Sequence, residues 1–123
     1  MSIVRAALTQ TVNAFKDMPD SVAGLASLKN RLDDVRAANV DHNVALIEAA
    51  ASVGAKIVCL GELCTGPYFA MTNDPMWLAL AEDAASGPSV NAFAKAAAAN
   101  GIVVVAPIYE LDSKAKKRFN TAV

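Results

Sequence analysis

Glu62 is the ionisable residue of this chain that is best placed for catalysis. It follows the apolar run 57–60, behind Gly61, and a parallel sheet usually places its site at the carboxyl ends of its strands. A carboxylate with Leu60 and Leu63 beside it is expected to lose solvation, which suits a general base or acid. The simpler interpretation, which position alone favours, is that Glu62 caps a helix or pairs with a basic residue.

Two cysteines and one histidine offer little for nucleophilic or metal chemistry. Cys59 lies inside an apolar run and is predicted to be a small core residue, whereas Cys64 falls in the following loop, where a thiol could react. The cysteine spacing matches no common zinc motif, and His42 is predicted to lie on the polar face of a helix. Glycine-rich nucleotide motifs and the GxSxG serine-hydrolase motif are absent. We therefore expect no metal and no cofactor.

Aromatic residues and a second carboxylate complete the candidates. Pro67, Tyr68 and Phe69 could line a pocket for a small organic substrate, or could form an apolar plug that holds a long loop onto the domain. We predict Tyr68 and Phe69 as substrate-binding residues. Glu110 is either a second buried acid or the solvated end of a strand.

Composition predicts one soluble domain. The 123 residues carry 11 Lys and Arg against 12 Asp and Glu, for a net charge of -1. This balance gives no electrostatic reason to expect a nucleic acid or an anionic membrane as partner. The hydrophobic share of 54% permits a packed core and excludes wholesale disorder. The chain start does not resemble a signal peptide, no stretch is long enough to span a bilayer, and two cysteines suit a reducing cytoplasm.

The elements that position these residues follow a strand–helix–strand pattern, which predicts an α/β fold. The continuous apolar runs 57–60 and 102–106 are typical of strands covered on both faces. We predict a loop and an exposed helix over 11–38, and short helices over 77–83 and 90–100. Strands that share one sheet, with a helix over 40–53 packed on it, are predicted near 3–10, 56–61, 102–108 and 119–123.

Residues 57–69 resemble the strand, catalytic glutamate and following loop of the carbon–nitrogen hydrolase (nitrilase) superfamily. The likeness is greatest to the N-carbamoyl amidohydrolases of the β-ureidopropionase type. It covers nearly the whole chain except 13–38, which is longer than the family's usual first connection. Further segments that match in order are 6–10, 39–55, 81–88, 103–110 and 120–123.

The resemblance implies a four-layer αββα sandwich and a catalytic set of Glu, Lys and Cys. A cysteine thiolate attacks the substrate carbon, the lysine stabilises the developing charge, and the glutamate is the general base. Of these three catalytic residues of the family, the glutamate alone has a counterpart in this sequence, which is Glu62. The family's lysine and nucleophilic cysteine are matched by none of Cys59, Cys64, Lys114, Lys116 and Lys117.

Because the last predicted strand is cut at Val123, the sequence is interpreted as the N-terminal part of a single carbon–nitrogen hydrolase domain. On this interpretation residues 1–123 contain an incomplete sheet, the C-terminal half is absent, and the isolated chain is inactive.

The expected function is hydrolysis of a non-peptide C–N bond in an N-carbamoyl amino acid, another ureide or a small amide. The expected partner is that small molecule, and the complete protein is expected to form a homo-oligomer. Alternative enzymes are a nitrilase or an amidase similar to N-carbamoylputrescine amidase. A different class of function is a catalytically incompetent α/β scaffold or assembly module.

Overall fold

Three short parallel strands form the central sheet. They are β1 (Ala6–Leu8), β2 (Ile57–Cys59) and β3 (Val103–Val105), in the order β1-β2-β3. These positions come from a computed structural model, which describes residues 3–123. The middle residues of the strands lie in register across the sheet, with Val58 paired to both neighbouring strands. The predicted strand, helix, strand order with parallel pairing is confirmed.

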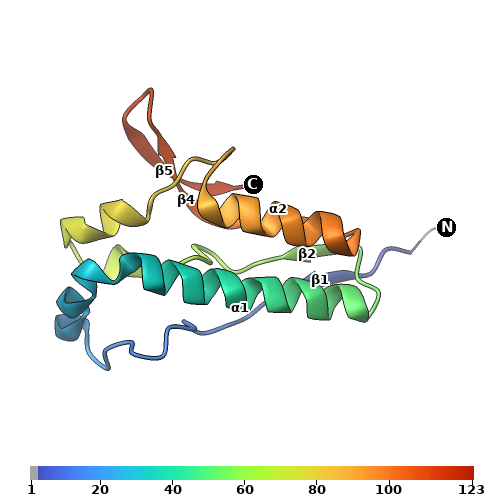
Figure 1. The fold of residues 1–123 in the computed structure, drawn as a ribbon, viewed down its shortest axis with the longest axis horizontal. Helices are drawn as coiled ribbons and strands as arrows, with labels where there is room; N and C mark the ends of the chain where they lie inside the picture. The colour runs from blue at the N-terminus through green and yellow to red at the C-terminus, as the bar shows by residue number, and fades with distance from the viewer. Residues whose placement is uncertain (1–2) are drawn as a thin grey trace.

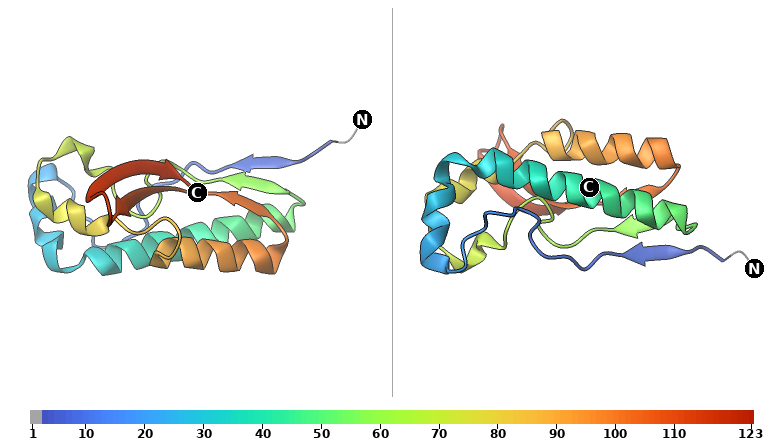
Figure 2. Two further views of the ribbon diagram at one scale, coloured as in Figure 1. Left: turned by 90° about the horizontal axis from the view of Figure 1, so that it is seen from above. Right: turned by 60° about the horizontal axis from the view of Figure 1, so that its bottom comes forward.

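Two long helices cover one face of this sheet. α1 (Leu32–Ser52) and α2 (Pro88–Asn100) lie side by side and form one layer (Figure 1). The strands form a second layer beside these helices (Figure 2). α2 begins with Pro88, whose fixed φ suits a first helical position, and ends at Gly101. Gly101 has φ +59° and donates its N–H to the last turn of the helix, a conformation that glycine adopts without strain.

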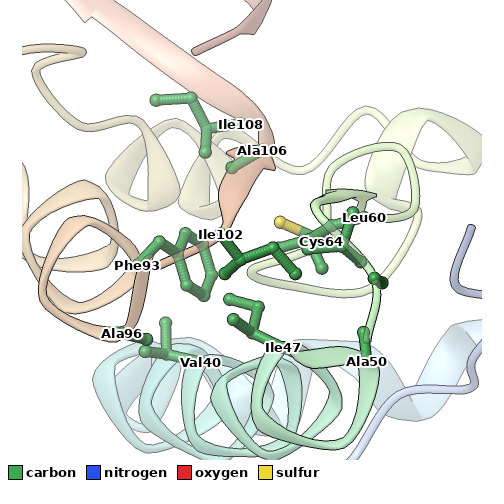
Figure 3. Close-up of a cluster of buried hydrophobic side chains, with 12 residues drawn as sticks. Val40, Ile47, Ala50, Leu60, Cys64, Phe93, Ala96, Ile102, Ala106 and Ile108 are labelled. Atoms are coloured by element: carbon green, nitrogen blue, oxygen red, sulfur yellow. The ribbon is translucent and has the colours of Figure 1, made fainter. Parts of the chain in front are cut away.

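The main core lies between the two helices and the sheet. Ile47 of α1 and Phe93 of α2 point into it (Figure 3), and Val58 of β2 belongs to the same buried cluster. Ile47 and Val58 are fully buried, so this contact removes helix and sheet surfaces from water at once. The buried members of this cluster are Val40, Ile47, Ala50, Ala55, Val58, Leu60, Cys64, Phe93, Ala96, Ile102, Ala106 and Ile108.

The segment before α1 is a loop followed by a mostly exposed helix, as predicted, but the type and bounds of the helix differ. It is a short 3-10 helix, η1 (Val22–Asn30), and α1 begins at Leu32 rather than near residue 40. Leu28 and Leu32 pack against the 3-10 helix η3 (Pro75–Leu80), which replaces the helix predicted over 77–83. The buried residues of this second cluster are Phe15, Leu28, Leu32, Val35, Met76, Trp77 and Leu80.

A hairpin of β4 (Pro107–Asp112) and β5 (Lys117–Ala122) forms a second, antiparallel sheet. The strand predicted near 119–123 is present as part of β5, which pairs antiparallel with β4. The prediction that all strand segments share one sheet is wrong, because the hairpin strands pair with each other and not with β1 or β2.

The division between the sheets falls at Ala106. The chain after Leu60 turns away from the sheet, and Pro107 has no N–H with which to extend a ladder. Ala106 instead exchanges two backbone hydrogen bonds with Val123, with N···O distances of 2.8 and 3.1 Å. The segment predicted as one strand over 102–108 is therefore shared between two sheets.

The face of the parallel sheet opposite the helices is apolar and open. Leu8 and Val103 on this face are 85% and 59% exposed, whereas Val58 on the helix face is fully buried. The two-sided cover expected for the runs 57–60 and 102–106 is incomplete among residues 3–123, because Ile57 and Cys59 are half-buried on this face and Val103 is exposed. None of the helices within residues 3–123 has the length and apolar character to cross a membrane.

Replacing Ile47 by Ala is expected to lower the free energy of unfolding by about 3 kcal/mol, because it leaves a cavity between α1 and the sheet. Urea denaturation followed by circular dichroism measures this change. Val53→Ala is the matched control: that side chain is 61% exposed, so its loss should change stability by about 0.5 kcal/mol or less. A loss of under 0.5 kcal/mol for Ile47→Ala would contradict the assignment of Ile47 to the core.

Candidate active site

Glu62 lies just beyond the carboxyl end of β2, where a cavity of about 440 Å³ opens. The cavity is formed between the segments that follow β1 and β2, which are neighbouring parallel strands. Its lining consists of 9–13, Asn39, 61–64 and 66–68. The structure thus places Glu62 at the edge of the sheet that the sequence predicted.

The loop around Glu62 bends sharply at the next residue. Leu63 has φ +49°, in the left-handed region that costs a residue with a Cβ about 1–2 kcal/mol. This bend turns Leu63 and Cys64 into the protein, where both are buried, while the Glu62 side chain remains exposed. The expected loss of solvation at Glu62 is therefore not found. Leu60 belongs to the main buried cluster, while Leu63 is buried and lines both cavities beside the exposed carboxylate.

Two buried asparagines of α1 hold the walls of the cavity. Asn43 Nδ2 donates to the carbonyl oxygens of Asn39 and Cys64, both at 2.9 Å, and so connects the helix to the loop of Glu62. Asn39 Oδ1 accepts the backbone N–H of Ala14 at 3.0 Å and connects the helix to the segment after β1. Cys64 N–H also donates to Pro107 O at 3.1 Å. The loop is thus attached to both α1 and the hairpin.

Asn120 of β5 is the direct partner of the Glu62 carboxylate. Its Nδ2 donates to Glu62 Oε1 at 2.6 Å, a contact between residues 58 positions apart. This hydrogen bond fixes the direction of the carboxylate, because it connects one of its oxygens to the hairpin. The second carboxylate oxygen, Oε2, is then available to exchange a proton with a bound group.

A second cavity of about 250 Å³ shares Glu62 and Tyr68 with the first and extends to the hairpin. Tyr68 is 58% exposed and lines both cavities, in keeping with a substrate contact. Phe69 stands at the start of the short 3-10 helix η2 (Phe69–Met71) and lines the second cavity. Its ring lies 5.9 Å from that of Trp77 and 4.9 Å from that of Tyr109. Phe69 therefore also fits the alternative of an apolar plug.

Cys64 is a core residue and not a reactive loop thiol. It belongs to the main buried cluster, and this burial raises the pKa of its thiol to about 12. Cys59 is half-buried on β2, adjacent in sequence to the fully buried Val58. Both cysteines are free thiols. The suggestion that Cys64 could react is therefore wrong for the folded chain.

The remaining polar candidates have structural contacts of their own. His42 Nε2 lies 2.6 Å from Thr11 Oγ1 and is half-buried, so it is less exposed than the sequence suggested. Glu110 is half-buried and accepts a hydrogen bond from Thr121 Oγ1. Among residues 3–123 no three His, Cys, Asp or Glu side chains are grouped so that they could hold a metal ion.

Three contributors to the site carried no assignable role in the sequence. Asn39 and Asn43 belong to a helix, where asparagine side chains are ordinarily solvated. Their four-residue spacing, which places both on one face of the helix, is the feature of the sequence that could have indicated a shared role. Asn120 belongs to a matched segment, but its contact with Glu62 depends on how the hairpin folds back over the loop. Strand alternation alone places Asn120 and Arg118 on one face of β5 and does not identify the partner of that face.

Comparison with known protein families adds one finding. Residues 24–123 match the family model described as carbon-nitrogen hydrolase. The matched range contains α1, β2, the loop of Glu62 and the whole hairpin.

Because its pKa is about 12, Cys64 should remain a neutral thiol throughout the pH range 7–9 and should resist alkylation in the folded protein. Iodoacetamide labelling at pH 8, followed by peptide mass spectrometry, checks this. Cys64 should be modified at least about 100-fold more slowly than after denaturation in urea. Modification of Cys64 at the same rate in the folded and denatured protein would contradict its burial.

Proposed function

The chain belongs to the carbon-nitrogen hydrolase family, and from that premise we propose that Glu62 is the general base in hydrolysis of a non-peptide C–N bond. The family itself implies C–N bond hydrolysis in general terms. We propose the finer substrate class to be an N-carbamoyl amino acid, a related ureide or a small amide. The resemblance of residues 57–69 and 81–88 to N-carbamoyl amidohydrolases supports this class.

The observation that carries the proposal is the placement of Glu62. The carboxylate stands at the carboxyl end of a parallel strand, is shared by two cavities, and is held at one oxygen by Asn120. Such a group has a fixed direction and access to a bound small molecule, which are the geometric requirements for a general base. Within residues 3–123, Glu62 forms none of the salt bridges and caps none of the helices, which argues against the simpler structural roles.

In the proposed reaction, Glu62 Oε2 accepts the proton of a cysteine thiol. The resulting thiolate forms a bond to the carbonyl carbon of the substrate, and a lysine stabilises the oxyanion. The C–N bond then breaks, and the leaving nitrogen takes the proton from Glu62 and departs as ammonia or an amine. Glu62 next accepts a proton from water, which hydrolyses the thioester and regenerates the thiol.

The lysine and the cysteine of this mechanism come from outside the described cavities. Cys64 lines the larger cavity, but burial raises the pKa of its thiol to about 12, and Cys59 lines neither cavity. No lysine lines either cavity within residues 3–123. We therefore propose that residues 1–123 alone do not hydrolyse the substrate, and that they form the N-terminal part of one catalytic domain.

The open apolar face of the parallel sheet supports the wider architecture we propose. Helices cover one face, while Leu8 and Val103 leave the other face in contact with water. A second sheet packed there would complete a four-layer αββα sandwich, since two sheets pack face to face about 10 Å apart. We further propose that the complete protein is a homo-oligomer and acts in the cytoplasm, where its free thiols would persist.

The same face is the observation that favours a second candidate function. An exposed apolar surface on a sheet is typical of an interaction site, so a catalytically incompetent α/β scaffold or assembly module would also use it. A nitrilase, or an amidase similar to N-carbamoylputrescine amidase, would share the Glu62 chemistry and differ in substrate.

Glu62→Gln keeps the shape of the side chain and removes its basic oxygen. In an enzyme that contains this chain together with the lysine and cysteine, kcat should fall by about two orders of magnitude or more. Steady-state hydrolysis of an N-carbamoyl amino acid, measured by ammonia or amine release, checks this. Thermal unfolding should be nearly unchanged, because Glu62 is exposed. A fully active Glu62→Gln enzyme would favour the scaffold.

Asn120→Ala removes the hydrogen bond that orients Glu62. In the same enzyme kcat should fall about 5- to 20-fold with a smaller change in KM, since a misdirected base slows chemistry more than binding. Asn91→Ala, which removes an exposed asparagine of α2 whose Nδ2 donates to Ser86 O, is the matched control and should leave kcat unchanged. Equal kcat values for Asn120→Ala and the unmodified enzyme would show that the contact does not position the base.

A further inference from the structure

Arg118 is the one cation that lines either cavity beside Glu62 within the described residues. It stands on β5 and borders the smaller cavity, together with Tyr68, Phe69 and Tyr109. The larger cavity has Glu62 as its charged group and is otherwise lined by neutral residues. The two cavities that meet at Glu62 therefore differ in charge.

The guanidinium of Arg118 is anchored but not neutralised. Its Nε lies 3.4 Å from Leu78 O in η3, which fixes the direction of the side chain. None of the salt bridges among residues 3–123 involves Arg118, and its near neighbour Asn120, not Arg118, contacts the Glu62 carboxylate. The terminal nitrogens are thus positioned to bind an added carboxylate, which arginine prefers to contact through two parallel N–H groups.

The surrounding charge reinforces this preference. The tip of the hairpin carries Lys114, Lys116 and Lys117 beside Arg118, against a single carboxylate at Asp112. Such a concentration of one sign raises the local concentration of ligands of the opposite sign. An anionic small molecule would therefore be attracted to the hairpin side of Glu62 and repelled from Glu62 itself.

The spacing along β5 fits a short molecule. Arg118 and Asn120 are two residues apart and share one face of the strand, so their Cα atoms are about 7 Å apart. Asn120 contacts Glu62 directly. A molecule whose reactive carbon lies beside Glu62 and whose carboxylate lies a few bonds away therefore spans from the base to Arg118.

We propose that Arg118 binds the carboxylate of the substrate and so selects N-carbamoyl amino acids over uncharged ureides and amides. This inference rests on the proposed function, because it takes Glu62 to be where the ureide reacts. It assigns the smaller cavity to the amino-acid part of the substrate, with Tyr68 and Tyr109 as its walls.

The test compares two ligands that differ in charge alone, N-carbamoyl-β-alanine and its carboxamide. Their dissociation constants are measured by titration calorimetry, on the protein with and without Arg118→Gln. The unmodified protein should bind the acid about tenfold more tightly than the carboxamide, since one charge-assisted pair at an open site contributes about this factor. Arg118→Gln should reduce the ratio to about one, mainly by weakening binding of the acid.

Lys117→Gln is the matched control, because it removes the same charge from the adjacent position and lines neither cavity. It should retain most of the tenfold preference. A ratio near one in the unmodified protein, a ratio that survives Arg118→Gln, or an equal loss in Lys117→Gln would overturn the assignment of Arg118. No detectable binding of either ligand would overturn it as well.

The proposed function of Glu62 is tested separately, by measuring hydrolysis of the carboxamide in the enzyme that also contains the lysine and cysteine. Hydrolysis that requires Glu62 but shows no preference for the acid would reject the role of Arg118 and retain that of Glu62. Binding of the acid through Arg118 without any dependence of hydrolysis on Glu62 would retain the role of Arg118 and reject that of Glu62.

Discussion

The site depends on a pair of asparagine side chains buried one helical turn apart in α1. Asn39 accepts a hydrogen bond from the backbone N–H of Ala14, Asn43 donates to the carbonyl oxygens of Asn39 and Cys64, and both side chains are buried. Leaving such a buried amide unpaired would cost about 1–3 kcal/mol. The two segments that form the larger cavity are therefore fixed relative to the helix, and through the helix relative to the core around Ile47. The walls of the cavity thus derive their positions from the same packing that stabilises the fold.

Sequence reasoning succeeded where a single local pattern determined the structure. The apolar run before Gly61 identified β2 and placed Glu62 at its carboxyl end, and the helix predicted over 90–100 ends where α2 ends. It failed where distant segments decide the outcome. The hairpin formed its own sheet because Ala106 pairs with Val123 and Pro107 cannot extend the parallel ladder. Within 11–38 it predicted a loop and a helix but not the division of the helical part into η1 and the start of α1, whose buried residues Leu28 and Leu32 share a cluster with η3.

The exposure of Glu62 illustrates a second limit of sequence reasoning. Leu60, Leu63 and Cys64 make the neighbourhood apolar in sequence, yet all three side chains enter the core and leave the carboxylate outside. Neighbours along the chain do not define the solvation of a side chain when the backbone reverses between them. The partner that Glu62 does have, Asn120, arrives from the hairpin and was identifiable only from the folded arrangement.

The loop around the left-handed bend at Leu63 contains positions under two kinds of constraint. The two residues directly after the bend, Cys64 and Thr65, are buried and therefore fixed by packing. Residues that remain outside, such as Glu62 and Tyr68, contribute little to stability. Substitutions at the outer positions can therefore change the exposed side chains while the chain still folds. Substitutions at the inner positions destabilise the fold, because those side chains are packed. A loop of this form lets new substrate preferences arise on an unchanged scaffold.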